Sequence, residues 1–208
     1  LSLCLINVPA GELMQGGDGL AGVPGREIAF RDAVTQAIDY ARALDVPSVN
    51  ILAGKQPLDA DLLHCLRTLA SNLKIATQLL SDAGIQPVFE MINGTDMPRF
   101  LLQNIAQAQE MLEAVQHPAL KMQYDCYHMA MMGENVLQAL KENIDAIGHI
   151  QFADCPGRHQ PNTGEIDYAA IFDYLKSSLY TGYVAAEYRP TPDSNGSLAW
   201  KSAFFPQA

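Results

Sequence analysis

The chain has 208 residues, of which 49% are hydrophobic and 17% are charged, and its formal net charge is -10 at pH 7. This length and composition suit one sizeable core, so we expect a single domain over residues 1–208. The excess of acidic groups would repel a phosphate backbone, and no apolar run reaches the roughly 18 residues of a membrane span. With no recognisable signal peptide either, we expect a cytoplasmic protein that binds neither nucleic acid nor membrane.

Short apolar runs alternate with helical patterns along the chain. The strand candidates, in chain order, are 2–6, 48–52, 86–90, 120–124, 147–152 and 183–187. Helical patterns follow them at 27–44, 59–83, 104–115, 136–144 and 167–179, and residues 197–205 suit the start of a closing helix. Repeated strand–helix units favour a parallel sheet with right-handed crossovers, and fully apolar strands indicate burial on both faces.

A doubly wound sheet and a barrel both fit this alternation. The first strand–helix junction has no Gly-x-Gly-x-x-Gly, and candidate polar residues follow four different strands instead of meeting at one switch point. We therefore predict an α/β fold of the (β/α)8 TIM barrel type. Only about six βα units are recognisable, against eight in a closed barrel of about 250 residues, so we expect the first two units to be missing from this chain.

Four polar residues each stand where an apolar run ends. They are Glu90, Asp125, Gln151 and Glu187, and their spacings of 35, 26 and 36 residues each correspond to about one strand-plus-helix unit. In a parallel barrel the C-terminal strand ends meet at one mouth, so these four oxygen donors can form a metal site. Any one of them alone could equally be a helix N-cap or a solvated loop charge. Four such residues at equivalent positions of successive strand–helix units favour the metal site.

Short motifs along nearly the whole chain add a family resemblance. They are Asn-Val-Pro-Ala-Gly at 7–11, Gly-Val-Pro-Gly-Arg-Glu at 22–27, Glu-Met-Ile-Asn at 90–93, Gln-Tyr-Asp-Cys-Tyr-His-Met at 123–129, Gly-His-Ile-Gln-Phe-Ala-Asp at 148–154, Gly-Glu-Ile-Asp-Tyr at 164–168 and Glu-Tyr at 187–188. In their order and spacing they resemble the hydroxypyruvate isomerase family of xylose-isomerase-like TIM barrels. One position departs from that pattern, because Ile6 stands where family members commonly carry a histidine.

The resemblance implies an aldose–ketose isomerase of carbohydrate metabolism, which interconverts a small sugar-acid pair such as hydroxypyruvate and tartronate semialdehyde through an enediolate. It implies that Glu90, Asp125, Gln151 and Glu187 bind a divalent metal ion. Oxygen donors with three negative charges favour Mg²⁺ or Mn²⁺ over zinc. Such a metal polarises the carbonyl, and Glu90 and Glu187 would be the catalytic acid and base on either side of the substrate.

Four further residues are candidates for substrate binding. By the resemblance, His128 matches a histidine that contacts substrate oxygens, although packing at a helix start is the alternative. His149 precedes the glutamine of the ligand set by two residues and faces the same way, with a structural role equally open. Arg158 lies in the next polar loop and could hold a substrate carboxylate bidentately, or be a solvated arginine. Lys55, after the second strand, is a weaker candidate.

Other functions stay open at this point. One is a sugar or sugar-acid epimerase of the same superfamily. A retaining glycoside hydrolase also uses two glutamates, but it needs neither Asp125 nor Gln151, and a single tryptophan is few for a sugar-stacking cleft. A non-catalytic sugar-acid-binding barrel is favoured by Ile6 and by the missing units. An apurinic endonuclease would need a histidine-rich zinc site and a basic DNA-binding face, and because the sequence shows neither we discount it. We expect a small sugar acid as the partner and leave a homo-oligomer open.

Overall fold

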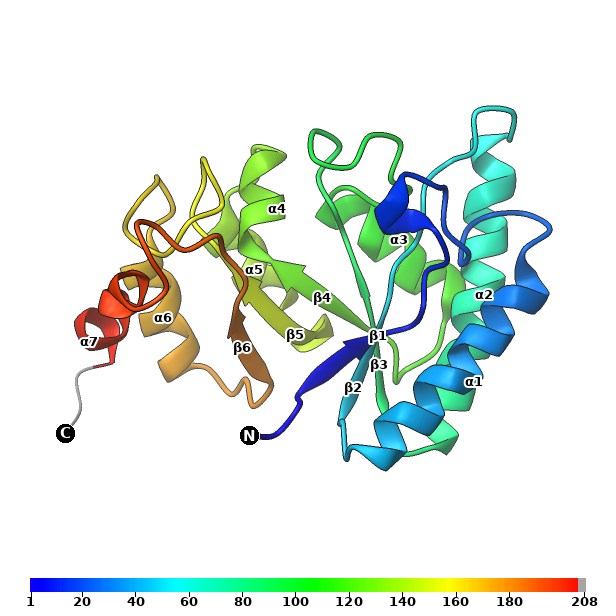
Figure 1. Cartoon of the computed structure of the whole chain (residues 1–208), viewed down its shortest axis with the longest axis horizontal. Coiled ribbons are helices and arrows are strands. Elements are labelled where there is room, and N and C mark those ends of the chain that lie inside the picture. The colour runs from blue at the N-terminus through cyan, green and yellow to red at the C-terminus, as the bar shows by residue number, and fades with distance from the viewer. Residues whose placement is uncertain (206–208) are drawn as a thin grey trace. The chain divides into compact units, whose positions relative to one another are not determined.

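The computed structural model of this chain describes residues 1–205 and divides it into two compact units, Leu1–Gln123 and Tyr124–Ala208. Strands and helices alternate in both (Figure 1). The strands are β1 (Leu5–Asn7), β2 (Ser48–Ile51), β3 (Gln86–Glu90), β4 (Lys121–Asp125), β5 (Ile147–Phe152) and β6 (Tyr183–Ala186). The α-helices are α1 (Glu27–Ala43), α2 (Leu62–Asp82), α3 (Ile105–Val115), α4 (Cys126–Met131), α5 (Val136–Asn143), α6 (Tyr168–Ser177) and α7 (Trp200–Phe204). Three short 3-10 helices complete the description, at Leu13–Gln15, Ile144–Ala146 and Gly196–Ala199.

The observed elements follow the predicted ones closely. Strands β3 and β5 have the predicted bounds, and the other strands and α1, α2, α3, α5 and α6 begin and end within about three residues of them. Helix α4 was not predicted, because its six residues are too few to show a helical period. It begins directly after Asp125, whose side chain accepts a hydrogen bond from Tyr127 N at 2.8 Å and so acts as its N-cap.

The N-terminal unit is a parallel sheet in the order β1-β2-β3-β4. Helices α1, α2 and α3 pack side by side along it (Figure 1). All four residues of β2 and the last four of β3 are buried, including Val49, Val88 and Phe89 at 0% exposure. Burying each such apolar side chain contributes roughly 1.5–3 kcal/mol. Burial on both faces explains why the adjacent residues Val88 and Phe89, which point to opposite faces of the sheet, are both apolar.

In the C-terminal unit β5 and β6 are parallel neighbours, and α4 packs against β5. An aromatic cluster holds the later helices in place: the Phe152 ring of β5 lies 5.3 Å from that of Phe172 on α6 and 5.2 Å from that of Trp200 on α7, both edge to face. Asp167 caps α6, because its Oδ1 accepts a hydrogen bond from Ala170 N at 3.0 Å. Within residues 1–205, none of the helices combines the length and the apolar character that a membrane span requires.

Candidate active site

The four predicted metal ligands all lie at the C-terminal ends of parallel strands. Glu90 and Asp125 are the last residues of β3 and β4, Gln151 is the last but one of β5, and Glu187 directly follows β6. Glu90 and Asp125 are buried, at 6% and 0% exposure, Gln151 is half-buried, and the Glu187 side chain is 51% exposed. The convergence of all four on one point stays a prediction.

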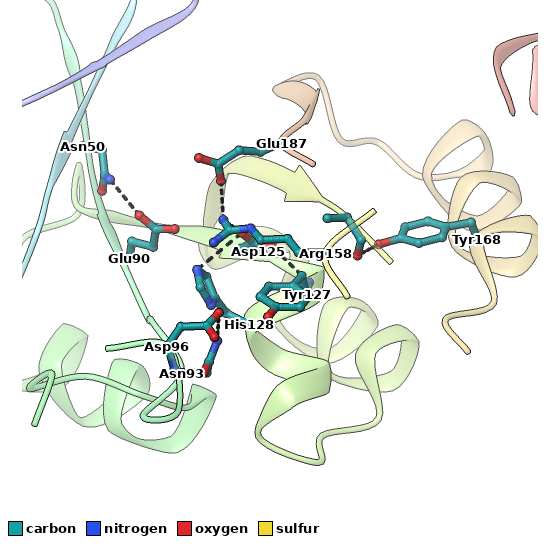
Figure 2. Close-up of polar contacts among 11 residues, drawn as sticks. Asn50, Glu90, Asn93, Asp96, Asp125, Tyr127, His128, Arg158, Tyr168 and Glu187 are labelled. Carbon is teal, nitrogen blue, oxygen red and sulfur yellow. Dashed lines mark hydrogen bonds and ion pairs between the residues drawn. The ribbon is translucent and has the colours of Figure 1, made fainter. Parts of the chain in front are cut away.

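In the N-terminal unit, the Glu90 carboxylate is bonded to an amide that the sequence did not single out. Asn50 Nδ2 donates to Glu90 Oε2 at 3.1 Å, as Figure 2 shows, and also to Asn7 Oδ1 at 3.1 Å. Asn50 is the third residue of β2 and is completely buried. The available signal was an asparagine between the apolar residues Val49 and Ile51 of a buried strand, where an amide needs a polar partner.

In the C-terminal unit, Arg158 joins two of the predicted ligands. Its Nη2 donates to Glu187 Oε2 at 2.8 Å and to Asp125 Oδ2 at 3.3 Å (Figure 2). The guanidinium also lies over the Tyr127 ring, with Cζ 5.0 Å from the ring centroid, and 21% of the Arg158 side chain is exposed. Arg158 therefore neutralises two strand-end carboxylates that are far apart in the sequence.

Asp125 is the centre of this cluster. While its Oδ1 caps α4, its Oδ2 lies 3.7 Å from Nε2 of His128, which is buried on the same helix. Desolvation raises the pKa of the Glu187 carboxyl, and the negative charge of Asp125 raises it further, whereas Arg158 and His128 oppose the rise. The unit thus brings together two carboxylates, a guanidinium and an imidazole.

The loop that carries Arg158 is built around Asp154, whose role the sequence did not reveal. Asp154 is completely buried; its Oδ1 accepts from Cys155 N at 2.9 Å and Ile166 N at 3.1 Å, and its Oδ2 accepts from Thr163 N at 3.0 Å. Arg158 has φ of 56°, a left-handed conformation that costs a side-chain-bearing residue roughly 1–2 kcal/mol. The hydrogen bonds to Asp154 hold the loop in spite of that strain, and so fix the position of the Arg158 backbone.

Two further predicted residues, His149 and Lys55, lie in the C-terminal and the N-terminal unit respectively. His149 lies in β5, is 2% exposed, and its Nδ1 has no hydrogen-bond partner among residues 1–205. Burial lowers the pKa of His149 to about 4, so the ring is neutral at pH 7. Lys55 is half-buried in the N-terminal unit, in a one-residue antiparallel bridge with Phe100. Substrate contacts of His149 and Lys55 stay predictions.

Comparisons with known proteins agree with this arrangement. The sequence model of the family described as "Xylose isomerase-like TIM barrel" matches residues 1–204. The chain is 40% identical over 200 residues to a hydroxypyruvate isomerase of Escherichia coli (strain K12), covering 96% of this chain and 78% of that protein. It is 36% identical over 200 residues to a 2-oxo-tetronate isomerase of Cupriavidus necator, with 96% and 77% covered.

A solved structure shares the fold in detail. A crystal structure described as AP endonuclease, family 2, from Brucella melitensis superposes with a TM-score of 0.92 at 32% identity, covering 98% of this chain and 79% of that one. The family match and this superposition confirm the predicted class. The six parallel strands are part of a (β/α)8 barrel.

Proposed function

We propose that this protein, which belongs to the xylose isomerase-like TIM barrel family, interconverts the aldose and ketose forms of a small sugar acid. Its hydroxypyruvate and 2-oxo-tetronate isomerase relatives show that it is an isomerase. Hydroxypyruvate and tartronate semialdehyde are the pair we favour. The observation that carries the substrate class is the Arg158 guanidinium beside two strand-end carboxylates.

The chemistry of Arg158 suits an acidic substrate. Among the described residues, both of its side-chain hydrogen bonds use Nη2, which leaves the N–H groups of Nη1 and Nε as charged donors for a substrate carboxylate. A local cation is needed, because a protein with net charge -10 repels an anionic substrate at long range. Tyr127 beneath the guanidinium restricts its movement and so favours a fixed binding position.

We assign proton transfer to Glu90 and Glu187 and metal binding to these two residues with Asp125 and Gln151. The support is their common place at strand ends, since the C-terminal strand ends of a parallel barrel open on one mouth. Three carboxylates and an amide oxygen suit a hard divalent cation such as Mg²⁺ or Mn²⁺. The pairing of Arg158 with Asp125 and Glu187 adds support, because two members of the set share one cationic group. When bound, the metal would polarise the substrate carbonyl and the neighbouring hydroxyl.

The proposed reaction moves one carbon-bound proton. One glutamate carboxylate removes a proton from C3 of hydroxypyruvate, and the electron pair forms the double bond of an enediolate. The other glutamate delivers a proton to C2, and the hydroxyl proton moves from the C3 oxygen to the C2 oxygen, so atoms and charge balance. Arg158 holds the carboxylate at C1 throughout, which keeps C2 and C3 between the two acid–base groups.

The test is turnover with matched variants. Metal-depleted protein is supplied with Mg²⁺ or Mn²⁺, and the interconversion of hydroxypyruvate and tartronate semialdehyde is followed by NMR in deuterated water. We expect metal-dependent turnover with deuterium incorporation, and a loss of at least about 100-fold in kcat for Glu187→Gln, since general acid–base catalysis contributes on this scale. Glu113→Gln, an exposed glutamate on α3, is the matched control and should retain the activity.

The comparison with the Brucella melitensis structure favours a second candidate, cleavage of DNA at abasic sites. The net charge of -10 opposes it, because nucleic-acid binding depends on neutralising phosphates. Incubation with abasic duplex DNA under the same metal conditions compares the two functions. Incision without isomerase turnover would replace the isomerase proposal, whereas full isomerase activity of Glu187→Gln would overturn the role assigned to Glu187.

A further inference from the structure

Asn50 occupies a position in β2 where the fold alone would be satisfied by an apolar residue. Its strand neighbours Val49 and Ile51 are apolar and, like Asn50, completely buried. Within residues 1–205, Oδ1 of Asn50 is buried with no hydrogen-bond partner. Unsatisfied buried polar atoms are uncommon in native proteins and destabilise them. The amide therefore needs an explanation other than the packing of the sheet.

Both hydrogens of the same amide are used. Nδ2 donates one to Glu90 Oε2 and the other to Asn7 Oδ1, each at 3.1 Å. The strand register makes this possible: Asn50 is paired with Asn7 in β1 and with Val88 in β3, and Glu90, two residues beyond Val88, points to the same face of the sheet. Asn7, Asn50 and Glu90 thus form a hydrogen-bonded row across three neighbouring strands.

We propose that Asn50 is a positioning residue, which holds the Glu90 carboxylate in one orientation for proton transfer and metal binding, and that Asn7 in turn orients Asn50. The inference rests on the proposed function, in which Glu90 has those two roles. An ionised carboxylate only accepts hydrogen bonds, so the row requires the amide nitrogen to face Glu90. Reversing the amide would place Oδ1 against the carboxylate and lose the bond to Glu90.

The effect follows from the burial of Glu90. At 6% exposure its carboxylate has little water to stabilise it, and a donor from the protein takes the place of that hydration. The same bond restricts side-chain rotation, and a misplacement of about 1 Å can cost roughly 100-fold in rate. Partners of this kind, one step removed from a metal, typically change metal affinity or activity by about 10–100-fold when they are lost.

Asn50→Leu is the variant that tests the inference, because leucine is close in size and has no donor. We expect kcat to fall about 10–100-fold with KM within about three-fold, since Asn50 is not assigned to the substrate. The affinity for Mn²⁺, measured by electron paramagnetic resonance without substrate, should weaken about ten-fold. Asn7→Leu should change both quantities in the same direction by less. Asn50→Ser, too short to reach Glu90, gives the same readings if the leucine variant does not fold.

The matched control is Asn72→Leu. Asn72 is also a buried asparagine of the N-terminal unit, at 1% exposure; it lies in α2, and its amide donates to Ala21 O at 2.8 Å. It should lose stability but keep kcat and the Mn²⁺ affinity. If Asn50→Leu and Asn72→Leu have equal kcat and equal Mn²⁺ affinity, the inference is overturned.

The two proposals fail in different ways. A wild-type protein that binds Mn²⁺ but does not isomerise sugar acids would refute the proposed function, while a selective loss of Mn²⁺ affinity in Asn50→Leu would still support the positioning role. An active wild-type enzyme whose Asn50 variants match Asn72→Leu would refute only the positioning role. A wild-type protein with neither turnover nor Mn²⁺ binding would refute both.

Discussion

Replacing Arg158 by Met removes the guanidinium while keeping an unbranched side chain over the Tyr127 ring. Two contacts are lost, at 3.3 Å to Asp125 and at 2.8 Å to Glu187. An exposed ion pair contributes up to about 1 kcal/mol, whereas removing one partner of a buried pair costs about 3–5 kcal/mol. Arg158 is 21% exposed and lies between a fully buried and a half-exposed carboxylate. Without metal we therefore expect the free energy of unfolding to fall by about 1–3 kcal/mol.

A divalent metal should reverse that loss. At the proposed metal site, Mn²⁺ would supply the positive charge that Arg158 supplied, and in the variant it would not compete with the guanidinium for Asp125 and Glu187. A ligand at 100 times its Kd stabilises the folded state by about 2.7 kcal/mol. The stabilisation by Mn²⁺ should thus be larger in Arg158→Met than in the wild-type protein, and the difference between the two proteins should become smaller.

Urea unfolding in EDTA and in saturating Mn²⁺ measures both effects. Arg31→Met, an exposed arginine on α1, is the matched control and should change stability by no more than about 0.5 kcal/mol in either condition. If Arg158→Met lowers the free energy of unfolding equally with and without Mn²⁺, the guanidinium and the metal do not share the carboxylates of Asp125 and Glu187. No loss in EDTA would mean that the ion pairs contribute nothing to stability.

Two further predictions follow from buried groups of the C-terminal unit. Asp154→Ala leaves three backbone N–H groups without their acceptor, so we expect about 2–4 kcal/mol lower stability and faster proteolysis within residues 155–165; an unchanged cleavage rate would contradict this role. The pKa of His149 is about 4 in the folded protein against 6.5 ordinarily, so between these pH values the unfolded chain binds a proton that the folded protein does not. The free energy of unfolding should fall by about 3 kcal/mol as the pH drops from 6.5 to 4, and urea unfolding of His149→Phe should lack that contribution.

The sequence by itself determined the order and the class of the elements. Apolar runs and helical periods are local patterns, and the segments 86–90 and 147–152 became strands with the expected bounds. The strand ends also located the acidic candidates, since a carboxylate directly after a buried strand breaks the apolar pattern. Local pattern could not predict α4, because a single capping hydrogen bond from Tyr127 N to Asp125 begins a helix that is shorter than two periods.

Only the tertiary structure decided what these side chains contact. Asn50 meets Glu90 across 40 residues because strand register places them on one face of the sheet. Arg158 meets Glu187 across 29 residues because a backbone hydrogen bond from Arg189 N to Arg158 O holds the loop beside the segment that follows β6. Both contacts depend on backbone geometry that is set by segments distant in the sequence. Spacing in the sequence determines which strand end a residue occupies, whereas the choice of hydrogen-bond partner is made only when the strands are packed.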